Sequence, residues 1–189
     1  MRKMLFFDYS QIHTNDGFKR ILNKPVKFSG NPLFISKESW EFGNLTMYGS
    51  VIKVEGKPFQ LWYTVISPEW KFYLAYTESD DGILWEKPLL NIFKYNNNSY
   101  TNIVLDCNPH GAAVIYDEEE EKEDWKYKML AGANCDGSIY AFRSADGIHW
   151  TQIRKYPVIT TNPDCPMGLL KNADGRYVAY HRIHDYGRR

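Results

Sequence analysis

The chain repeats one short turn motif, and this repeat limits the folds that it can adopt. Residues 79–85 read Ser-Asp-Asp-Gly-Ile-Leu-Trp, and residues 144–150, which begin 65 positions later, read Ser-Ala-Asp-Gly-Ile-His-Trp. An Asp-Gly pair supplies the residue that takes a positive φ in a tight turn. The Trp that follows can anchor an outer strand against a neighbouring sheet. A repeat at this spacing indicates an array of similar structural units.

Each copy of the turn follows the same order of short apolar segments, and none of these shows a sustained helical period. A glycine-led strand, an aromatic strand and a third strand precede each turn, all rich in Val, Ile, Tyr, Phe and Trp. This pattern predicts an all-β fold. The competing architecture is a β-sandwich, but sandwiches do not usually repeat a turn at this length. We therefore expect a β-propeller with four-stranded blades.

The predicted blades cover residues 40–105, 106–160 and 161–189, and residues 1–39 form an N-terminal lead-in. The last blade is partial, with strands expected at 164–170 and 174–180. Three blades cannot close a ring, and an open ring leaves unpaired strand edges. We expect either that the C-terminal blades are missing from this chain or that it self-associates through its open edges.

The charge balance excludes two classes of partner. The sequence has 23 Lys and Arg residues against 23 Asp and Glu residues. Nucleic acids and membrane surfaces attract an excess of basic residues, so neither is expected as a partner. Aromatic residues make up 16% of the chain. They can fill the core between sheets, and their flat faces also suit sugar rings.

The cysteines and the amino-terminal residues indicate a simple, cofactor-free protein. Cys107, Cys135 and Cys165 are odd in number and widely spaced, which fits neither a disulfide framework nor a metal site. No glycine-rich phosphate loop is present, so we expect no cofactor and no metal. The apolar run after the first basic residues is only four residues long, too short for a signal peptide. A cytoplasmic location follows, or secretion if the start is truncated.

Several stretches taken together resemble the amino-terminal part of five-bladed propeller proteins related to glycoside hydrolase family 32 and its neighbour family 43. Family 32 comprises invertase- and fructanase-like enzymes. The resemblance covers nearly the whole chain but about the first half of the expected domain. The stretches that carry it are residues 6–8, 30–33, 39–41, 61–63, 81–88, 127–130, 146–150 and 175–180.

The resemblance implies a central funnel with three acidic residues, one on the innermost strand of each of the first three blades. Glycoside cleavage uses such paired carboxylates. Residues 164–166, Asp-Cys-Pro, resemble the Glu-Cys-Pro motif that holds the general acid of the family. Asp164 is therefore the candidate general acid, with a side chain one methylene shorter than Glu. The alternative is an aspartate in a turn before a strand.

The first blade departs from the family pattern. Residues 43–49 lack the carboxylate expected just before the first inner strand. Glu41 is the nearest acid and becomes the second catalytic candidate, while a structural Trp-Glu corner is the competing interpretation. Trp40 and Tyr48 are candidate substrate-binding residues.

The second blade carries Asn108, Pro109 and His110 in place of the Arg-Asp-Pro motif of the family. His110 would face Tyr48 across the funnel and bind a sugar hydroxyl or act as acid or base near neutral pH. Asp106 is the third catalytic candidate. His181 and Arg182 follow the second strand of the third blade and are candidate substrate-binding residues.

Three functions are compatible with these residues. The first is a glycoside hydrolase-like propeller that acts on terminal sugars of oligo- or polysaccharides, with Asp164 as proton donor. The second is a carbohydrate-binding propeller that has lost its catalytic acids. The third is a scaffold propeller that recognises protein. A carbohydrate substrate or ligand is the expected partner under the first two.

Overall fold

The computed structural model of the protein describes residues 13–183 apart from 15, 18, 20, 134–136, 161 and 162. The chain divides into two units, Met1–Asn31 and Pro32–Arg189. The described residues of the first unit form no helix or strand. Residues 6–8 of the family-like motifs, Cys135 and the residues after Ile183 lie outside the described part.

The first sheet of the second unit contains five strands, all paired antiparallel. The strands are β1 (Leu45–Thr46), β2 (Val51–Lys53), β3 (Phe59–Ile66), β4 (Phe72–Ser79) and β5 (Ile103–Leu105). Both β1 and β2 pair with β3, so they form one first strand interrupted around Gly49. A Cβ atom at Gly49 would lie 1.8 Å from the carbonyl oxygen of Trp62, so only glycine fits this approach.

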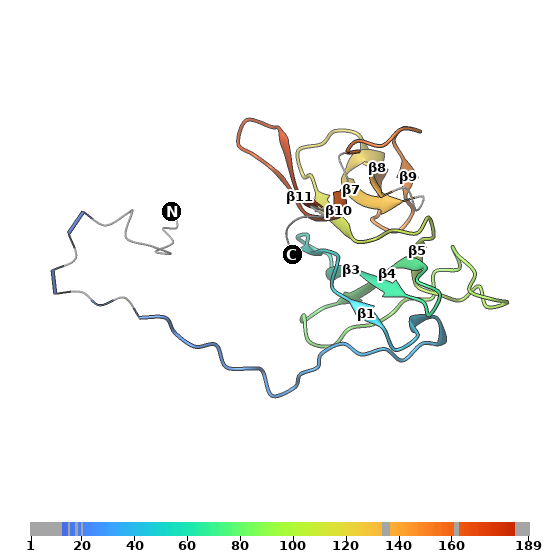
Figure 1. The fold of residues 1–189 in the computed structure, drawn as a ribbon, viewed down its shortest axis with the longest axis horizontal. Helices are drawn as coiled ribbons and strands as arrows, with labels where there is room; N and C mark the ends of the chain where they lie inside the picture. The colour runs from blue at the N-terminus through green and yellow to red at the C-terminus, as the bar shows by residue number, and fades with distance from the viewer. Residues whose placement is uncertain are drawn as a thin grey trace. The chain divides into compact units, whose positions relative to one another are not determined.

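Two further antiparallel sheets follow along the chain (Figure 1). The second sheet contains β6 (Ala112–Tyr116), β7 (Tyr127–Ala133), β8 (Ser138–Ser144) and β9 (Thr151–Gln152) in chain order. The third pairs β10 (Pro163–Lys171) with β11 (Tyr177–Ile183). The helical elements of the described residues are two 3-10 turns, η1 (Ser39–Glu41) and η2 (Glu123–Trp125). Neither is long and apolar enough to cross a membrane.

The repeated motif forms the same turn twice. The Asp81 carboxylate accepts hydrogen bonds from the backbone N–H groups of Ile83 and Leu84 at 2.7 and 2.8 Å. The Asp146 carboxylate does the same for the two residues at the equivalent positions, both at 2.8 Å. In each copy the serine hydroxyl accepts from the glycine N–H at 2.9 Å. The sequence repeat is therefore also a structural repeat.

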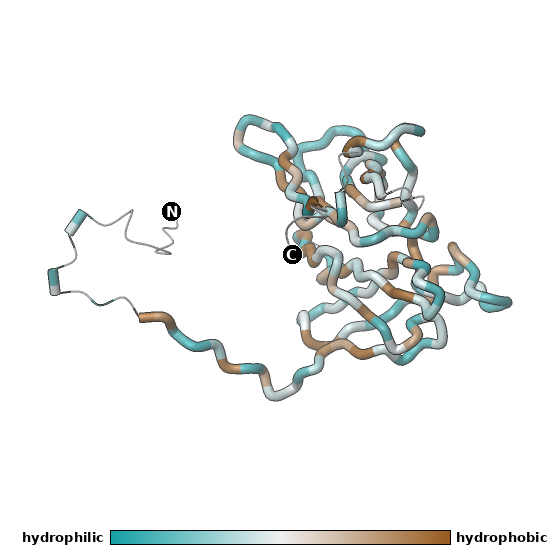
Figure 2. Tube along the Cα trace, in the orientation of Figure 1, coloured by the Kyte–Doolittle hydropathy of each residue, from teal (hydrophilic) through white to brown (hydrophobic). Residues whose placement is uncertain are grey.

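Alternation along β3 divides the core into two layers. Leu61, Tyr63 and Val65 join one buried cluster, whereas Trp62 joins a second cluster that it shares with strands of the second sheet. The Trp62 indole N–H donates to the carbonyl oxygen of Gly147 at 2.7 Å, in the repeated turn of that sheet. Figure 2 shows hydrophobic stretches within the sheets and hydrophilic ones in the outer loops. Both faces of β3 are thus buried, as expected of a central strand.

The tryptophans of the two turns have different partners. Trp150 packs edge-on against Trp62 of the first sheet, with ring centroids 6.4 Å apart, and so anchors its turn to a neighbouring sheet. Trp85 packs instead on the cluster of its own sheet. The predicted anchoring role therefore holds for the second copy of the motif and not for the first.

A buried carboxylate attaches the third sheet to the second. Asp117, at the end of β6, accepts hydrogen bonds from the Lys171 ammonium of β10 at 3.0 Å and from the Tyr177 hydroxyl of β11. Lys128 of β7 lies 3.3 Å away. Burial alone would raise the pKa of Asp117, but these donors outweigh it and hold the pKa well below its ordinary value.

The fold is all-β, and the sheets do not close a ring within the described part of the chain. When β1 and β2 are taken as one interrupted strand, each of the first two sheets has four antiparallel strands in chain order, as propeller blades do. The third sheet has two strands. The division at 40–105, 106–160 and 161–189 stays a prediction.

Candidate functional site

The first strands of the three sheets converge at Gly111. A Cβ atom at this residue would lie 3.2 Å from Cβ of Cys165 in the third sheet and 3.4 Å from Cβ of Tyr48 in the first. The φ angle of Gly111 is +79°, which also favours glycine. The N–H of Ala112 donates to the Tyr48 carbonyl oxygen at 3.0 Å. Residues beside these three positions therefore lie close together although they are far apart in the sequence.

Asp164 lies at this convergence with two cationic or titratable neighbours. Its side chain is 2% exposed. The Arg182 guanidinium of β11 forms an ion pair with one carboxylate oxygen, and the other lies 3.4 Å from Nδ1 of His110. The His110 side chain is one-third exposed and that of Arg182 is half exposed. We call Asp164, His110, Arg182 and Tyr48 the Asp164 cluster.

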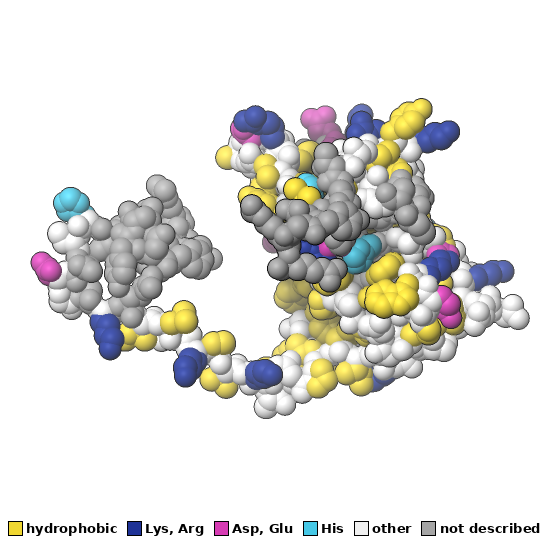
Figure 3. Space-filling view, in the orientation of Figure 1, with side chains coloured by type: hydrophobic (Ala, Val, Ile, Leu, Met, Phe, Trp, Pro, Cys, Tyr) yellow, Lys and Arg dark blue, Asp and Glu magenta, His cyan; other side chains and the backbone are white. Residues whose placement is uncertain are grey.

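Aromatic side chains border the Asp164 cluster on one side. The Tyr48 and His110 rings meet edge to face with centroids 5.8 Å apart, and Tyr48 remains 39% exposed. The ring of Phe72, the first residue of β4, lies 4.7 Å from the His110 ring. Figure 3 shows histidine, acidic and basic side chains beside hydrophobic ones on the face that it presents. The predicted pair of Tyr48 and His110 is brought together here, and Phe72 was not predicted.

Asp106 has a different partner from Asp164. Its carboxylate forms an ion pair with the Lys71 ammonium at 2.8 Å, in the turn between β3 and β4. The hydrogen bond to this carboxylate raises the pKa of Lys71. Two residues further along, the Asn108 side-chain oxygen accepts from the Phe72 N–H at 2.8 Å. The segment that carries Asp106 and His110 is thus fixed to the β3–β4 turn.

Trp40 and Glu41 lie in the core, which differs from the predicted place beside the funnel. The Glu41 side chain is fully buried. It accepts hydrogen bonds from the Tyr63 hydroxyl at 2.7 Å, from Lys87 at 2.7 Å and from the N–H groups of Lys37 and Glu38. Because every oxygen is already engaged away from solvent, this carboxylate serves the structural corner that was the competing interpretation.

The indole of Trp40 completes the same buried network. Its N–H donates to the Asn102 side-chain oxygen at 2.8 Å, and the Asn102 amide donates to the Tyr63 hydroxyl at 2.7 Å. Burial alone would raise the pKa of Glu41, but the hydrogen bond from Lys87 and the others outweigh it. The pKa of Glu41 therefore lies below its ordinary value of 4.5. A ring that is 4% exposed offers no face to a sugar.

His181 lies beside Arg182 on β11 and pairs across the strand with Pro166. Its side chain is half-buried, and Nδ1 has no hydrogen-bond partner among the described residues. His181 therefore neighbours Arg182, a member of the Asp164 cluster, along β11.

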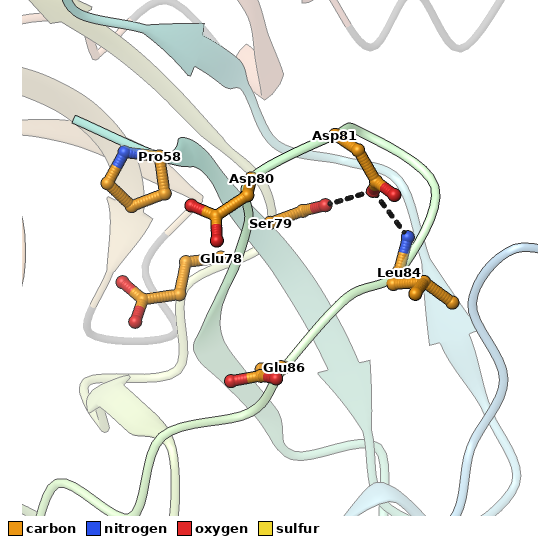
Figure 4. A pocket seen from close by; sticks show the side chains of 7 residues that line it. All are labelled: Pro58, Glu78, Ser79, Asp80, Asp81, Leu84 and Glu86. Atoms are coloured by element: carbon orange, nitrogen blue, oxygen red, sulfur yellow. Dashed lines mark hydrogen bonds between the residues drawn. The ribbon is translucent and has the colours of Figure 1, made fainter. Parts of the chain in front are cut away.

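A hollow of about 270 Å³ lies at the repeated turn of the first sheet, apart from the Asp164 cluster (Figure 4). Four acidic side chains line it, and one of them, Asp81, is engaged by its own turn through Ser79 and Leu84. Across the described residues, no group of three or more His, Cys, Asp or Glu side chains is arranged to hold a metal ion. The residues that line the hollow are Pro58, Glu78, Ser79, Asp80, Asp81, Leu84 and Glu86.

Comparison with known proteins finds solved structures that are similar to this chain. No family model and no curated protein matches the sequence. A glycosyl hydrolase from Bacteroides ovatus matches with a TM-score of 0.54 and 17% identity, over 79% of this chain and 45% of that protein. A protein from Bacteroides ovatus ATCC 8483, provisionally named a glycoside hydrolase, matches with a TM-score of 0.46 and 20% identity, over 69% and 41%.

The first of these structures bears out the predicted fold class. Its likeness to this chain shows a shared fold, and the all-β sheets of this chain, which do not close a ring in the described residues, are consistent with the predicted incomplete propeller. This chain spans less than half the length of that protein. The relation to families 32 and 43 and the number of five blades stay predictions.

Proposed function

We propose that the chain is part of a five-bladed, glycoside hydrolase-like propeller that acts on terminal sugars at the Asp164 cluster, with Asp164 as the proton donor. One observation carries the proposal: a buried carboxylate lies where three sheets converge, and half-exposed polar side chains border it. Buried titratable groups with specific charged partners are typical of functional sites. The relation to glycoside hydrolase families 32 and 43 belongs to this proposal.

The chemistry assigned to the cluster is acid-assisted cleavage of a glycosidic bond. The bond between the anomeric carbon and the leaving-group oxygen breaks while that oxygen takes a proton from Asp164, and positive charge develops on the sugar ring. The oxygen of a water molecule then bonds to the anomeric carbon and loses a proton. His110 lies 3.4 Å from the Asp164 carboxylate and is accessible from solvent, so it can bind a sugar hydroxyl or take the proton of a water molecule. Tyr48 offers a partly exposed ring to the face of the sugar.

The second candidate function is carbohydrate binding without cleavage. The ion pair between Asp164 and Arg182 favours it, because a proton donor must be protonated and a guanidinium neighbour favours the charged carboxylate. Most glycoside hydrolases also use a second carboxylate, and Tyr48 and His110 contribute none at the convergence. In this function Arg182 would donate hydrogen bonds to sugar hydroxyls, and Asp164 would accept hydrogen bonds from them.

Sugar release from fructans, arabinans, xylans and aryl glycosides distinguishes the two functions. We expect the unmodified chain to release sugar and Asp164→Asn to release none while it still shows a cooperative thermal unfolding transition. Asp174→Asn is the matched control, because Asp174 lies in the exposed β10–β11 turn and should keep full activity. Release that persists in Asp164→Asn contradicts the proton-donor role. Binding of these sugars without release identifies the second function.

A further inference from the structure

The turn between β3 and β4 presents an exposed tryptophan in an unfavourable backbone conformation. Trp70 is 74% exposed and has a φ angle of +60°. Bulky side chains rarely adopt this left-handed region. The turn is nevertheless well defined, because the Ser67 N–H donates to the Lys71 carbonyl oxygen at 2.8 Å and the Trp70 N–H donates to the Ser67 carbonyl oxygen at 3.0 Å. A strained residue held by its surroundings is a reason to look for function.

This turn is directly connected to the Asp164 cluster. Lys71 forms the ion pair with Asp106, and Phe72 places its ring against that of His110. His110 in turn contacts Tyr48 and Asp164. Lys71 and Phe72, the two residues that follow Trp70, therefore join this turn to Asp106 and to His110 of the Asp164 cluster.

The side chains around Trp70 have the chemistry that recognises a sugar ring. An indole is a large apolar face, and the C–H groups on one side of a pyranose or furanose ring can pack on it. Lys71 and Asp106 are 46% and 25% exposed, so each retains capacity to hydrogen-bond hydroxyl groups. Charged groups make the stronger hydrogen bonds to such hydroxyls.

We infer that Trp70, with Lys71 and Asp106, forms an additional carbohydrate subsite that binds a second sugar unit of an oligosaccharide whose first unit occupies the Asp164 cluster. This inference rests on the proposed function. It also gives Asp106 a role in positioning substrate, in place of the catalytic role that the sequence suggested. The ligand is then a chain of at least two units and not a single sugar.

Calorimetric affinities for arabino-, xylo- and fructo-oligosaccharides of one to four units test the subsite. We expect the unmodified chain to bind the longer members of one series more tightly than the single sugar. Trp70→Ala should lower the affinity for the longer oligosaccharide, divided by the affinity for the single sugar, about 2- to 12-fold. This is the range for one stacked aromatic contact. Trp70→Phe, which keeps a flat ring, should retain most of the ratio. Tyr156→Ala is the matched control, because Tyr156 is 72% exposed in another loop.

The possible results separate this inference from the proposed function. A ratio that Trp70→Ala leaves unchanged, or that Tyr156→Ala lowers equally, overturns the Trp70 subsite. Binding of the single sugar without preference for longer chains overturns it as well, while the proposed function stands. If the unmodified chain binds no member of any series, both the proposed function and the subsite are wrong.

Discussion

Glu41→Gln should reduce the stability of the protein without removing the proposed activity toward sugars. The substitution preserves the shape of a side chain that is fully buried and that accepts four hydrogen bonds. It removes the charge opposite the Lys87 ammonium, whose side chain is only 12% exposed. An amide nitrogen must also replace one of the two acceptor oxygens, which both receive hydrogen bonds from protein groups.

The size of the effect follows from the partners that are lost. Hydrogen bonds to a charged group contribute about 1.5–3 kcal/mol each, and breaking a buried ion pair from one side costs about 3–5 kcal/mol. The glutamine oxygen still accepts from part of the donor set, so we expect a loss of about 3 kcal/mol in the free energy of unfolding. With a urea dependence of about 2 kcal/mol per M, the unfolding midpoint should fall by about 1.5 M.

Urea unfolding, monitored by tryptophan fluorescence, measures this shift. Glu86→Gln is the matched control, because Glu86 is an exposed glutamate of the same sheet.

The pKa of Glu41 is lower in the folded protein than its ordinary value of 4.5. Its contribution to stability is therefore complete above pH 4.5 and is lost as the pH falls through the folded pKa. The difference between Glu41→Gln and the unmodified chain should shrink over that window. A variant of normal stability that no longer releases sugar would refute the structural assignment.

Two further substitutions test how the sheets are joined. Trp62→Phe keeps a large ring but leaves the carbonyl oxygen of Gly147 without its buried indole donor. The free energy of unfolding, measured by thermal unfolding, should therefore fall by about 1–3 kcal/mol. An unchanged transition would show that this hydrogen bond contributes nothing to stability. Asp117→Asn should increase amide hydrogen exchange in β10 and β11, because Lys171 and Tyr177 lose their charged acceptor. Since the folded pKa of Asp117 lies below its ordinary value of 3.8, stability should decline more steeply below pH 4 in the unmodified chain than in this variant. An equal decline in both would contradict the assignment.

Local features of the fold could be predicted from the sequence. The two Ser-x-Asp-Gly turns were recognisable because the hydrogen bonds from their Ser and Asp side chains join residues within a few positions of one another. The all-β class followed from the strand-like segments between them. The interruption of the first strand at Gly49 was not predicted, because it depends on the close approach of the Trp62 carbonyl group.

The candidate site was predicted in part. Tyr48 and His110 were expected at one site, and their ring centroids lie 5.8 Å apart. The burial of Glu41 was not decidable from its neighbours in sequence, because Lys87, its ionic partner, lies 46 positions away. Trp70 was also missed, although the Ser-Pro-Glu-Trp stretch between two strand-like segments indicates a turn that exposes its last residue.

The order of strands in the second sheet has a consequence for how the protein folds. Strands β6 to β9 are neighbours in the sheet in the order in which they occur in the chain. Each pairing therefore closes only a short loop, and the entropy lost on closure is small. The contact of Trp62 with Gly147 spans 85 residues and can form only after both sheets exist. Folding should accordingly begin with hairpins inside each sheet, and docking between sheets should limit its rate.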